Sequence, residues 1–218
     1  MSLNRRFENC TVAILGDSYS TFRGFIPEER ECYYPSPERV DDVLTVEDTW
    51  WRQLFAKRNM TLLFNDSWSG STVCTTVRER HPQESAFVHR MKKSLCPTKT
   101  TEQSPECILL FGGTNDSWMG TEIGSLMYRD WTEKDLRQVL PAYCYMLDYV
   151  CKSNPNATVF CILNTQLKPE IHEGILTACE HYGAVAVELH NINKKSGHPS
   201  RLGMQQIAQQ LDEVLDQY

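Results

Sequence analysis

The chain has 218 residues, enough to bury one substantial hydrophobic core without a second domain, so we expect one domain over residues 1–218. Its formal net charge of -6 argues against nucleic acid or an anionic membrane as the main partner. The nine cysteines are too widely spaced for a Cys-x-x-Cys site, and no apolar signal core is present, which together predict reduced thiols in a cytoplasmic protein. The longest apolar runs are strand-sized, so no transmembrane helix is expected.

The first predicted strand is a short apolar run, Val12–Leu15, that is β-branched at two positions and is ended by Gly16. Ser18 follows just past the carboxyl end of this strand, where open α/β sheets bind their ligands, so it is well placed for a nucleophile. Taken alone, the same stretch could be an ordinary turn in which Ser18 or Ser20 caps a helix.

A long loop is predicted over residues 22–45, which contain three prolines and the pair Tyr33-Tyr34 but little periodicity. Loops of this length are usually functional. This one could form a rim over the site or a contact between copies of the chain, which leaves a homo-oligomer open. Apolar residues at helical spacing then predict a helix over residues 46–58.

Residues 61–65 are predicted to form the second strand, and a polar loop with Gly70 at its centre follows. Gly70 could be a simple turn glycine, or it could bring a backbone N–H close to an oxyanion, where a side chain would obstruct the approach. After a short helix around residues 84–93, the third strand is predicted at residues 107–111.

The segment after the third strand, Gly112-Gly-Thr-Asn-Asp116, presents Asn115 as an amide donor at the carboxyl edge of the sheet, although asparagine after glycine is also common in plain turns. A second long loop is predicted over residues 116–131. We expect the next helix to cover residues 132–151 and to kink at Pro141.

Two further strands are predicted at residues 156–163 and 184–189, with a helix at residues 168–181 between them. His198 then lies on a loop just before the closing helix, which ends near Leu215. A loop histidine is usually inert, so the meaning of this one depends on what lies beside it.

Strands alternate with helices along the whole chain, which predicts an α/β fold with a parallel sheet and helices on both faces. The carboxyl ends of parallel strands meet at one edge, and Ser18, Gly70, Asn115 and His198 each follow a strand. These four residues should therefore converge. A nucleophile, two oxyanion donors and a base are what acyl transfer requires.

The order and composition of these segments resemble the SGNH, or GDSL-like, hydrolases. Gly16-Asp17-Ser18 is similar to the family's first block, Gly70 to its second, Gly112–Asp116 to its third and His198-Pro199-Ser200 to its last. The resemblance spans residues 11–215 in matching order. It implies a three-layer α/β/α flavodoxin-like fold with a five-stranded parallel sheet of order 2-1-3-4-5.

The resemblance also implies ester hydrolysis without a metal or another cofactor. Ser18 would attack the ester carbonyl, and His198 would take its proton. The N–H groups of Ser18 and Gly70 and the Asn115 side chain would hold the oxyanion. One departure from the family is plain: the aspartate usually found three residues before the histidine is Lys195 here.

Lys195 leads us to predict a Ser18–His198 dyad, in which a main-chain carbonyl from residues 191–197 orients the imidazole. A lysine cannot stabilise an imidazolium as a carboxylate does. The nearest upstream acid, Glu188, lies in a predicted strand.

Other side chains are assigned to the surroundings of the site. Asp17 and Asp116 are expected to brace their loops. Trp68, Trp118 and Trp131 lie on or near the site loops, and flat aromatic rings there, Trp68 and Trp118 above all, could stack on a sugar or form a hydrophobic lid.

These observations predict a serine esterase that cleaves a small-molecule ester, with an O-acyl carbohydrate favoured. Two alternatives stay open. A flavodoxin-like protein could bind a flavin or a phosphate through the hydroxyl-rich residues 16–21. A non-catalytic relative of the hydrolases, which the lysine at position 195 makes plausible, could bind a glycan or a protein partner.

Overall fold

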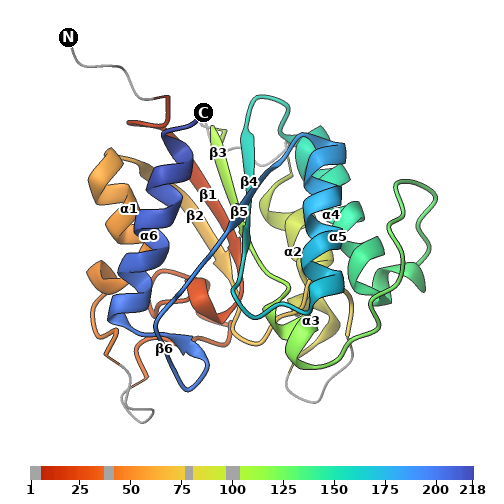
Figure 1. Cartoon of the computed structure of the whole chain (residues 1–218), viewed down its shortest axis with the longest axis horizontal. Helices are drawn as coiled ribbons and strands as arrows, with labels where there is room; N and C mark the ends of the chain where they lie inside the picture. Colours follow the sequence, from red (N-terminus) through yellow and green to blue (C-terminus); the bar gives the residue numbers. More distant parts are fainter. Residues whose placement is uncertain (1–5, 37–41, 77–80, 97–103) are drawn as a thin grey trace.

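The computed structural model describes residues 6–36, 42–76, 81–96 and 104–218. Its centre is a five-stranded parallel sheet of order β2-β1-β3-β4-β5, which confirms the expected fold class and strand order (Figure 1). The strands are β1 (Thr11–Gly16), β2 (Thr61–Ser67), β3 (Cys107–Phe111), β4 (Thr158–Leu163) and β5 (Val185–Glu188).

The sheet is covered on both faces because successive side chains of each strand point to opposite sides. In β1, Val12 and Ile14 belong to one hydrophobic cluster, and Ala13 and Leu15 belong to the other. The first cluster lies beneath α1 (Trp50–Arg58) and α6 (Arg201–Leu215), and the second beneath α2 (Phe87–Ser94), α4 (Val139–Ser153) and α5 (Pro169–Tyr182) (Figure 1).

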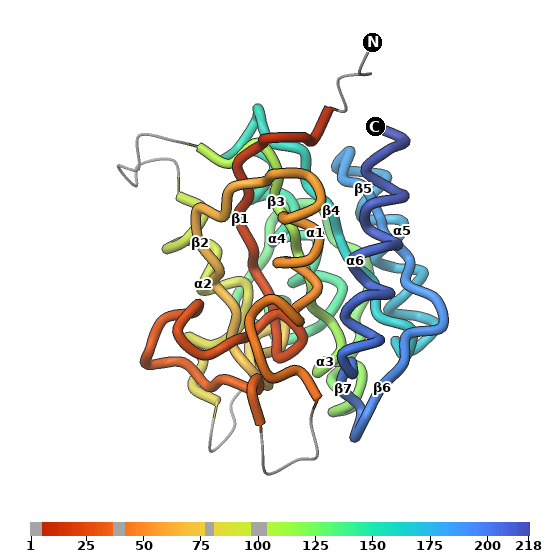
Figure 2. The backbone as a smooth tube through the Cα atoms, turned by 90° about the vertical axis from the view of Figure 1, so that its left-hand side faces the viewer, coloured from red at the N-terminus to blue at the C-terminus, as the bar shows by residue number. Residues whose placement is uncertain are grey.

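The strand register places the carboxyl ends of the strands side by side. Gly16 pairs with both Ser67 and Phe111, and Leu163 pairs with Glu188. The loops that follow the strands therefore start from one edge. The short helix α3 (Thr114–Trp118) and the hairpin of β6 (Lys194–Lys195) and β7 (His198–Pro199) lie together at this end of the molecule in both views (Figures 1 and 2).

The start of α4 differs from the sequence prediction. The expected helix over residues 132–151 is wrong at its beginning, because residues 135–137 form a separate 3-10 turn, η5 (Asp135–Arg137), and α4 begins at Val139. Pro141 therefore lies in the first turn of the helix. An N–H there would have no acceptor within the helix, so the reason for expecting a kink at this proline is absent.

Two other predicted boundaries also change. The predicted helix over residues 46–58 is divided into a 3-10 turn, η3 (Val46–Asp48), and α1, because the Thr49 side chain accepts a hydrogen bond from the Arg52 N–H and caps a new helix. The predicted loop over residues 116–131 is wrong at its start, where Asp116–Trp118 belong to α3. Five residues are too few to show helical periodicity, so this helix has no sequence signal.

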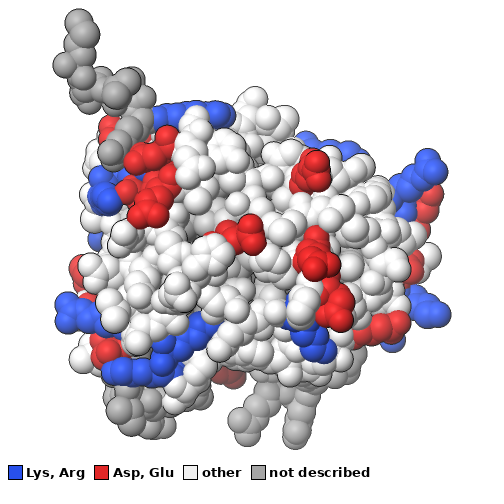
Figure 3. Space-filling view, in the orientation of Figure 1, with Lys and Arg blue, Asp and Glu red and all other residues white. Residues whose placement is uncertain are grey.

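The long loop over residues 22–45 contains neither helix nor strand within its described parts, residues 22–36 and 42–45. Short 3-10 turns occur at η1 (Ser18–Ser20) and η4 (Gln83–Ser85). Among the described residues, no helix has the length and apolar composition that crossing a membrane needs. Both positively and negatively charged side chains lie on the face of the molecule shown in Figure 3.

Candidate active site

Ser18 is the first residue of η1, directly after the central strand β1, and only 4% of its surface is exposed. Asp17 caps this turn, since its Oδ1 accepts a hydrogen bond from the Tyr19 N–H at 3.0 Å. The Asp17 N–H donates to the carbonyl of Phe111 at 3.1 Å, which fastens the turn to the end of β3. The serine is therefore held by the sheet itself.

The structure brings His198 to this serine, with 2.9 Å between the Nε2 atom of His198 and the Oγ atom of Ser18. His198 begins β7, and Lys195 pairs with it across a two-residue turn. The turn residues Ser196 and Gly197 have φ angles of 47° and 80°, the combination that a type I′ hairpin requires. The expected loop is thus a tight hairpin that points the imidazole at the Ser18 hydroxyl.

The other ring nitrogen of His198, Nδ1, lies 3.4 Å from the carbonyl oxygen of Ser196. A strong N–H···O bond is shorter than this. The contact still favours the ring orientation in which Nδ1 faces the Ser196 carbonyl and Nε2 faces Ser18. Lys195, which occupies the place of the family's usual aspartate, forms an ion pair with Asp42 at 2.7 Å. Asp42 also accepts the N–H of Arg201 at 2.8 Å, so the long loop holds both the hairpin and the start of α6.

Aromatic residues surround the hairpin. The ring of Tyr33 stacks on His198 with a centroid distance of 3.6 Å and an interplanar angle of 9°. The hydroxyls of Tyr19 and Tyr34 donate to the carbonyl oxygens of Gly197 and Pro199, at 2.6 and 2.7 Å. The pair Tyr33-Tyr34 was assigned only to a loop from sequence, and no local pattern indicates these contacts.

Gly70 adopts a φ of 76°, a left-handed conformation that favours glycine. The imidazole of His81 lies directly against Gly70, where a side chain on residue 70 would meet the ring. The backbone conformation therefore favours glycine at this position, and the neighbouring His81 ring leaves little space for a side chain. His81 was not identified from the sequence.

Asn115 is buried in α3, with 8% of its surface exposed. Its Nδ2 atom donates to the carbonyl of Ser71 at 2.9 Å, which ties α3 to the residue after Gly70. A side-chain amide has two N–H bonds, so one donor remains after this contact. This bond attaches Asn115 to the loop that carries Gly70.

Asp116, the next residue, fastens the same loop. Its carboxylate accepts the N–H groups of Val73 and Cys74, with distances of 2.9 to 3.2 Å, and also the Cys74 thiol. Burial raises the pKa of Asp116, while these donors oppose the rise. The carboxylate spans α3 and the loop after β2, which are contacts of a loop brace.

Asp17 directly precedes Ser18, and the pKa of its carboxyl group is strongly perturbed. Complete burial raises its pKa to about 7, the Tyr19 N–H opposes this rise, and the nearby Asp116 adds to it. Its carboxylate points into its own turn rather than toward His198, because its Oδ1 accepts from Tyr19. Asp17 therefore shapes the turn that carries Ser18.

Arg90 of α2 is a site support that sequence reasoning missed. Its guanidinium is 2% exposed and donates to the carbonyl of Gly16 at 3.0 Å and to the Ser71 hydroxyl at 3.1 Å. It also donates to the main chain of Asp66 and forms an ion pair with its carboxylate. Burial lowers the pKa of Arg90 to about 9, and the charge of Asp17 raises it. One buried cation thus connects the ends of β1 and β2.

The candidate tryptophans have different positions. Trp118 is 45% exposed, and its ring centroid lies 5.8 Å from that of His198. Trp68 lies beneath the guanidinium of Arg30, at 5.5 Å from the ring centroid. Trp131 packs against Tyr145 of α4. Of the three, Trp118 is the one with a contact to the candidate catalytic pair.

Lys194, also missed from sequence, lies beside the site. Its ammonium donates to side-chain oxygens of Asn164, Thr165 and Gln166, at 2.7 to 3.2 Å, and is half-buried. Burial lowers its pKa to about 8, although Asp17 opposes the change. Lys194 therefore connects the hairpin to the end of β4.

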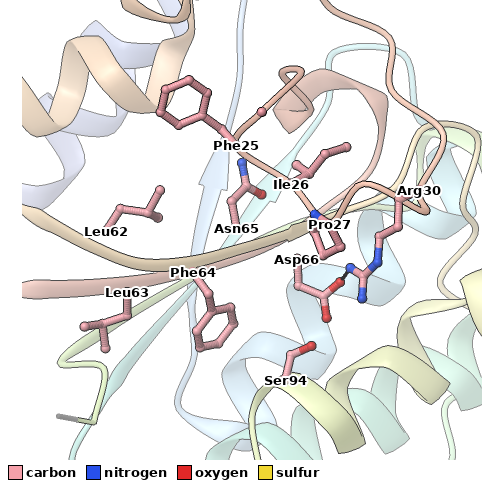
Figure 4. Close-up of a pocket in the computed structure, with 11 residues that line it drawn as sticks. Phe25, Ile26, Pro27, Arg30, Leu62, Leu63, Phe64, Asn65, Asp66 and Ser94 are labelled. Atoms are coloured by element: carbon pink, nitrogen blue, oxygen red, sulfur yellow. Dashed lines mark ion pairs between the residues drawn. The ribbon is translucent and has the colours of Figure 1, made fainter. Parts of the chain in front are cut away.

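A separate cavity of about 540 Å³ extends along the edge strand β2 (Figure 4). Its apolar walls are Phe25–Pro27 of the long loop and Leu62–Phe64 of β2, and the Arg30–Asp66 ion pair lies at one end. Neither Ser18 nor His198 lines this cavity. It is distinct from the candidate site at Ser18 and His198.

Comparison with known proteins identifies a family and a shared fold. A family model described as GDSL-like lipase/acylhydrolase matches residues 10–215. A candidate GDSL-like lipase from Bacteroides ovatus is 38% identical, with a TM-score of 0.88, 96% of this chain covered and 99% of that chain. One from Bacteroides uniformis is 39% identical, with a TM-score of 0.88 and coverages of 96% and 97%.

More distant structures share the fold. A family two carbohydrate esterase from Clostridium thermocellum, solved in complex with cellohexaose, has a TM-score of 0.64 at 17% identity. The match covers 96% of this chain and 64% of that chain, and likeness at this level of identity shows the fold alone. No match was found among curated proteins.

Proposed function

The chain belongs to the GDSL-like lipase/acylhydrolase family, a family of ester hydrolases, and we propose that it cleaves a small carboxylic ester through an acyl-enzyme on Ser18. The observation that carries this proposal is the 2.9 Å contact between the Ser18 hydroxyl and His198 Nε2 at the carboxyl edge of the sheet. A nucleophile within hydrogen-bonding reach of its base is the basic requirement of serine catalysis.

In the proposed reaction, the Ser18 oxygen attacks the ester carbonyl while its proton moves to His198 Nε2, which gives a tetrahedral intermediate. His198 then passes the proton to the departing alcohol, and the acyl group stays on Ser18. Water, deprotonated by His198, attacks the acyl-enzyme and releases the carboxylic acid. The serine recovers its proton, so the enzyme returns to its starting state.

Three donors are proposed for the oxyanion: the backbone N–H groups of Ser18 and Gly70 and the second N–H of the Asn115 amide. The bond from Asn115 to Ser71 fixes the direction of this amide before substrate binds. Donors fixed in advance stabilise the developing charge without reorganisation during the reaction.

An O-acyl carbohydrate is the substrate class we favour. The exposed ring of Trp118 beside His198 offers a flat apolar face on which a sugar could stack. The carbohydrate esterase from Clostridium thermocellum shares the fold, which supports this choice by analogy only.

The proposal is tested by treating the purified protein with a fluorophosphonate probe and mapping the adduct by mass spectrometry. We expect the label on Ser18, and we expect Ser18→Ala to lose both labelling and hydrolysis of short-chain aryl esters. Ser20→Ala is the matched control, because Ser20 lies in the same turn as Ser18. This variant should keep both the label and the activity. A label on Ser20, or full activity in Ser18→Ala, would overturn the assignment.

A further inference from the structure

The imidazole of His198 lies among four aromatic rings. Tyr33 stacks on it at 3.6 Å and 9°, which places the two rings face to face. The rings of Tyr19, Trp118 and Tyr34 lie at centroid distances of 5.3, 5.8 and 6.5 Å, with interplanar angles between 59° and 77°. Only Tyr33 among these four presents its face parallel to the imidazole.

The stacked pair is fixed from both sides. Tyr33 is 6% exposed, and its N–H donates to the Thr21 hydroxyl at 3.0 Å. The hairpin cannot easily move away from it, because the tyrosine hydroxyls at positions 19 and 34 hold the carbonyl groups on either side of His198. The stack is therefore part of the packed structure.

The face of an aromatic ring carries partial negative charge and attracts a cation that lies over it within about 6 Å. In the proposed reaction, His198 becomes a cation when it takes the proton of Ser18. The attraction to Tyr33 is consequently stronger when the imidazole is charged than when it is neutral. An interaction that strengthens as the transition state forms lowers the activation barrier.

We propose that Tyr33 is a positioning residue whose ring face stabilises the His198 imidazolium, a task that the aspartate performs in related hydrolases. This inference rests on the proposed function, since it concerns the same histidine. Tyr33 acts through His198 and is not assigned a contact with substrate.

Other charged and titratable groups lie around the hairpin, and the test must leave them in place. They come from the hairpin itself, the long loop, α6 and the turn of Ser18, where Asp17 acts on the charge of Lys194: Lys194, Lys195, Asp42, Arg201, Asp17 and Tyr19. Two of them are already engaged with each other, because the Lys195 ammonium lies 2.7 Å from Asp42. Variants of Tyr33 change none of these groups, so a difference between such variants reports on the ring.

The first experiment measures the titration midpoint of the His198 ring by NMR in a Ser18→Ala background, which requires no catalytic activity. Tyr33→Phe retains an aromatic face, whereas Tyr33→Leu removes it. We expect the midpoint in Tyr33→Leu to be lower than in Tyr33→Phe by about half to one pH unit. Equal midpoints, or a higher midpoint in the leucine variant, would overturn the proposal.

The second experiment measures the pH profile of aryl-ester hydrolysis with Ser18 restored. In Tyr33→Leu we expect the acid limb of kcat/KM to move to lower pH by the same amount and kcat to fall by about 3- to 10-fold. Tyr33→Phe should keep the acid limb in place. A residue with only a packing role would lower kcat without moving the limb, and that result would contradict the proposal.

Two controls separate the possible failures. If Tyr33→Leu does not fold, Tyr33→Met supplies a second variant of apolar character without a ring, and the same midpoint shift is expected. If the unaltered protein hydrolyses no ester and takes no fluorophosphonate label, the proposed function fails. The NMR midpoints still decide the role of Tyr33 in that case.

Discussion

The two members of the candidate catalytic pair are held by very different parts of the molecule. Ser18 follows the central strand of the sheet and is 4% exposed, and beneath it lies the buried guanidinium of Arg90. His198 lies on a hairpin whose strands have two residues each, and this hairpin is attached by tyrosine contacts and by the half-exposed Lys195–Asp42 ion pair.

This difference shows where each kind of interaction is useful. On the serine side, buried charges and strand ends specify one geometry, and removing a partner leaves an uncompensated charge inside the protein. On the histidine side, exposed ion pairs contribute little, so the contacts that hold the ring are aromatic stacking and hydrogen bonds to main-chain carbonyls. Substitutions on the two sides should therefore have effects of different size.

Arg90→Met should have the largest effect, a loss of about 3–5 kcal/mol in the free energy of unfolding, because it leaves the buried Asp66 carboxylate without one of its cations. The ion pair of Asp66 with Arg30 moderates this loss toward the lower value. Urea unfolding monitored by circular dichroism measures it. The stability of Arg90→Lys should lie between that of the unaltered protein and that of Arg90→Met, because lysine keeps the charge but lacks the planar guanidinium. A loss below 1 kcal/mol in Arg90→Met would show that the buried cation does not hold the serine side together.

Asn115→Ala should lower kcat by about 10²- to 10³-fold with little change in KM, because an oxyanion donor acts mainly in the transition state. Steady-state hydrolysis of an aryl ester measures both constants. Because the amide also holds the carbonyl of Ser71, unfolding should be compared in the same variant. A change confined to KM would mean that Asn115 binds substrate instead.

Asp17→Asn tests the buried carboxyl group of the serine turn. The pKa of Asp17 in the folded protein, about 7, lies above its ordinary value of 3.8. Between these values the folded state binds a proton that the unfolded state has released, so this group lowers stability as the pH rises from about 4 to 7. We therefore compare the free energy of unfolding of the variant with that of the unaltered protein at pH 4 and at pH 8. The difference should move in favour of the variant by roughly 2 kcal/mol between the two pH values, which is about half of the free energy that corresponds to the full pKa shift. A difference that does not change with pH would contradict the raised pKa.

The fold was predictable because β1, β3 and β4 are largely buried apolar runs, each followed by a polar or glycine-rich segment. β3 was expected at its observed bounds, Cys107–Phe111. The errors occur where local signals are short. α3 has only five residues, which are too few to show helical periodicity.

The candidate site was only partly predictable for a related reason. Ser18 and Asn115 could be proposed because each follows a strand of a parallel sheet, and topology then places them at one edge. Tyr33 and Asp42 contact a hairpin more than 150 positions away in the chain, on a loop without periodicity, so no local pattern identifies them. Arg90 had one signal that was not used: a basic residue between Phe87 and Met91 on the apolar face of a short helix.

Lys195→Ala addresses the histidine side and should have a small effect. The Lys195–Asp42 pair is 45% and 40% exposed, and ion pairs of this kind contribute less than about 1 kcal/mol. We expect kcat to remain within a few-fold of its original value, and a double-mutant cycle with Asp42→Ala should give a coupling energy in the same small range. A loss of activity greater than tenfold would mean that the ion pair, rather than the tyrosines, positions the hairpin.

Glu188→Gln should have the smallest effect of all. A carboxylate that completed a triad would have to lie at His198 Nδ1, where its charge would stabilise the imidazolium. Glu188 instead pairs with His172 of α5, at 3.0 Å from its Nε2 atom, and the carbonyl of Ser196 lies 3.4 Å from His198 Nδ1. We therefore predict that kcat in Glu188→Gln stays within a few-fold of its original value and that its pH profile keeps its shape. If this variant folds normally but hydrolyses no ester, Glu188 supplies the missing carboxylate and the predicted dyad is wrong.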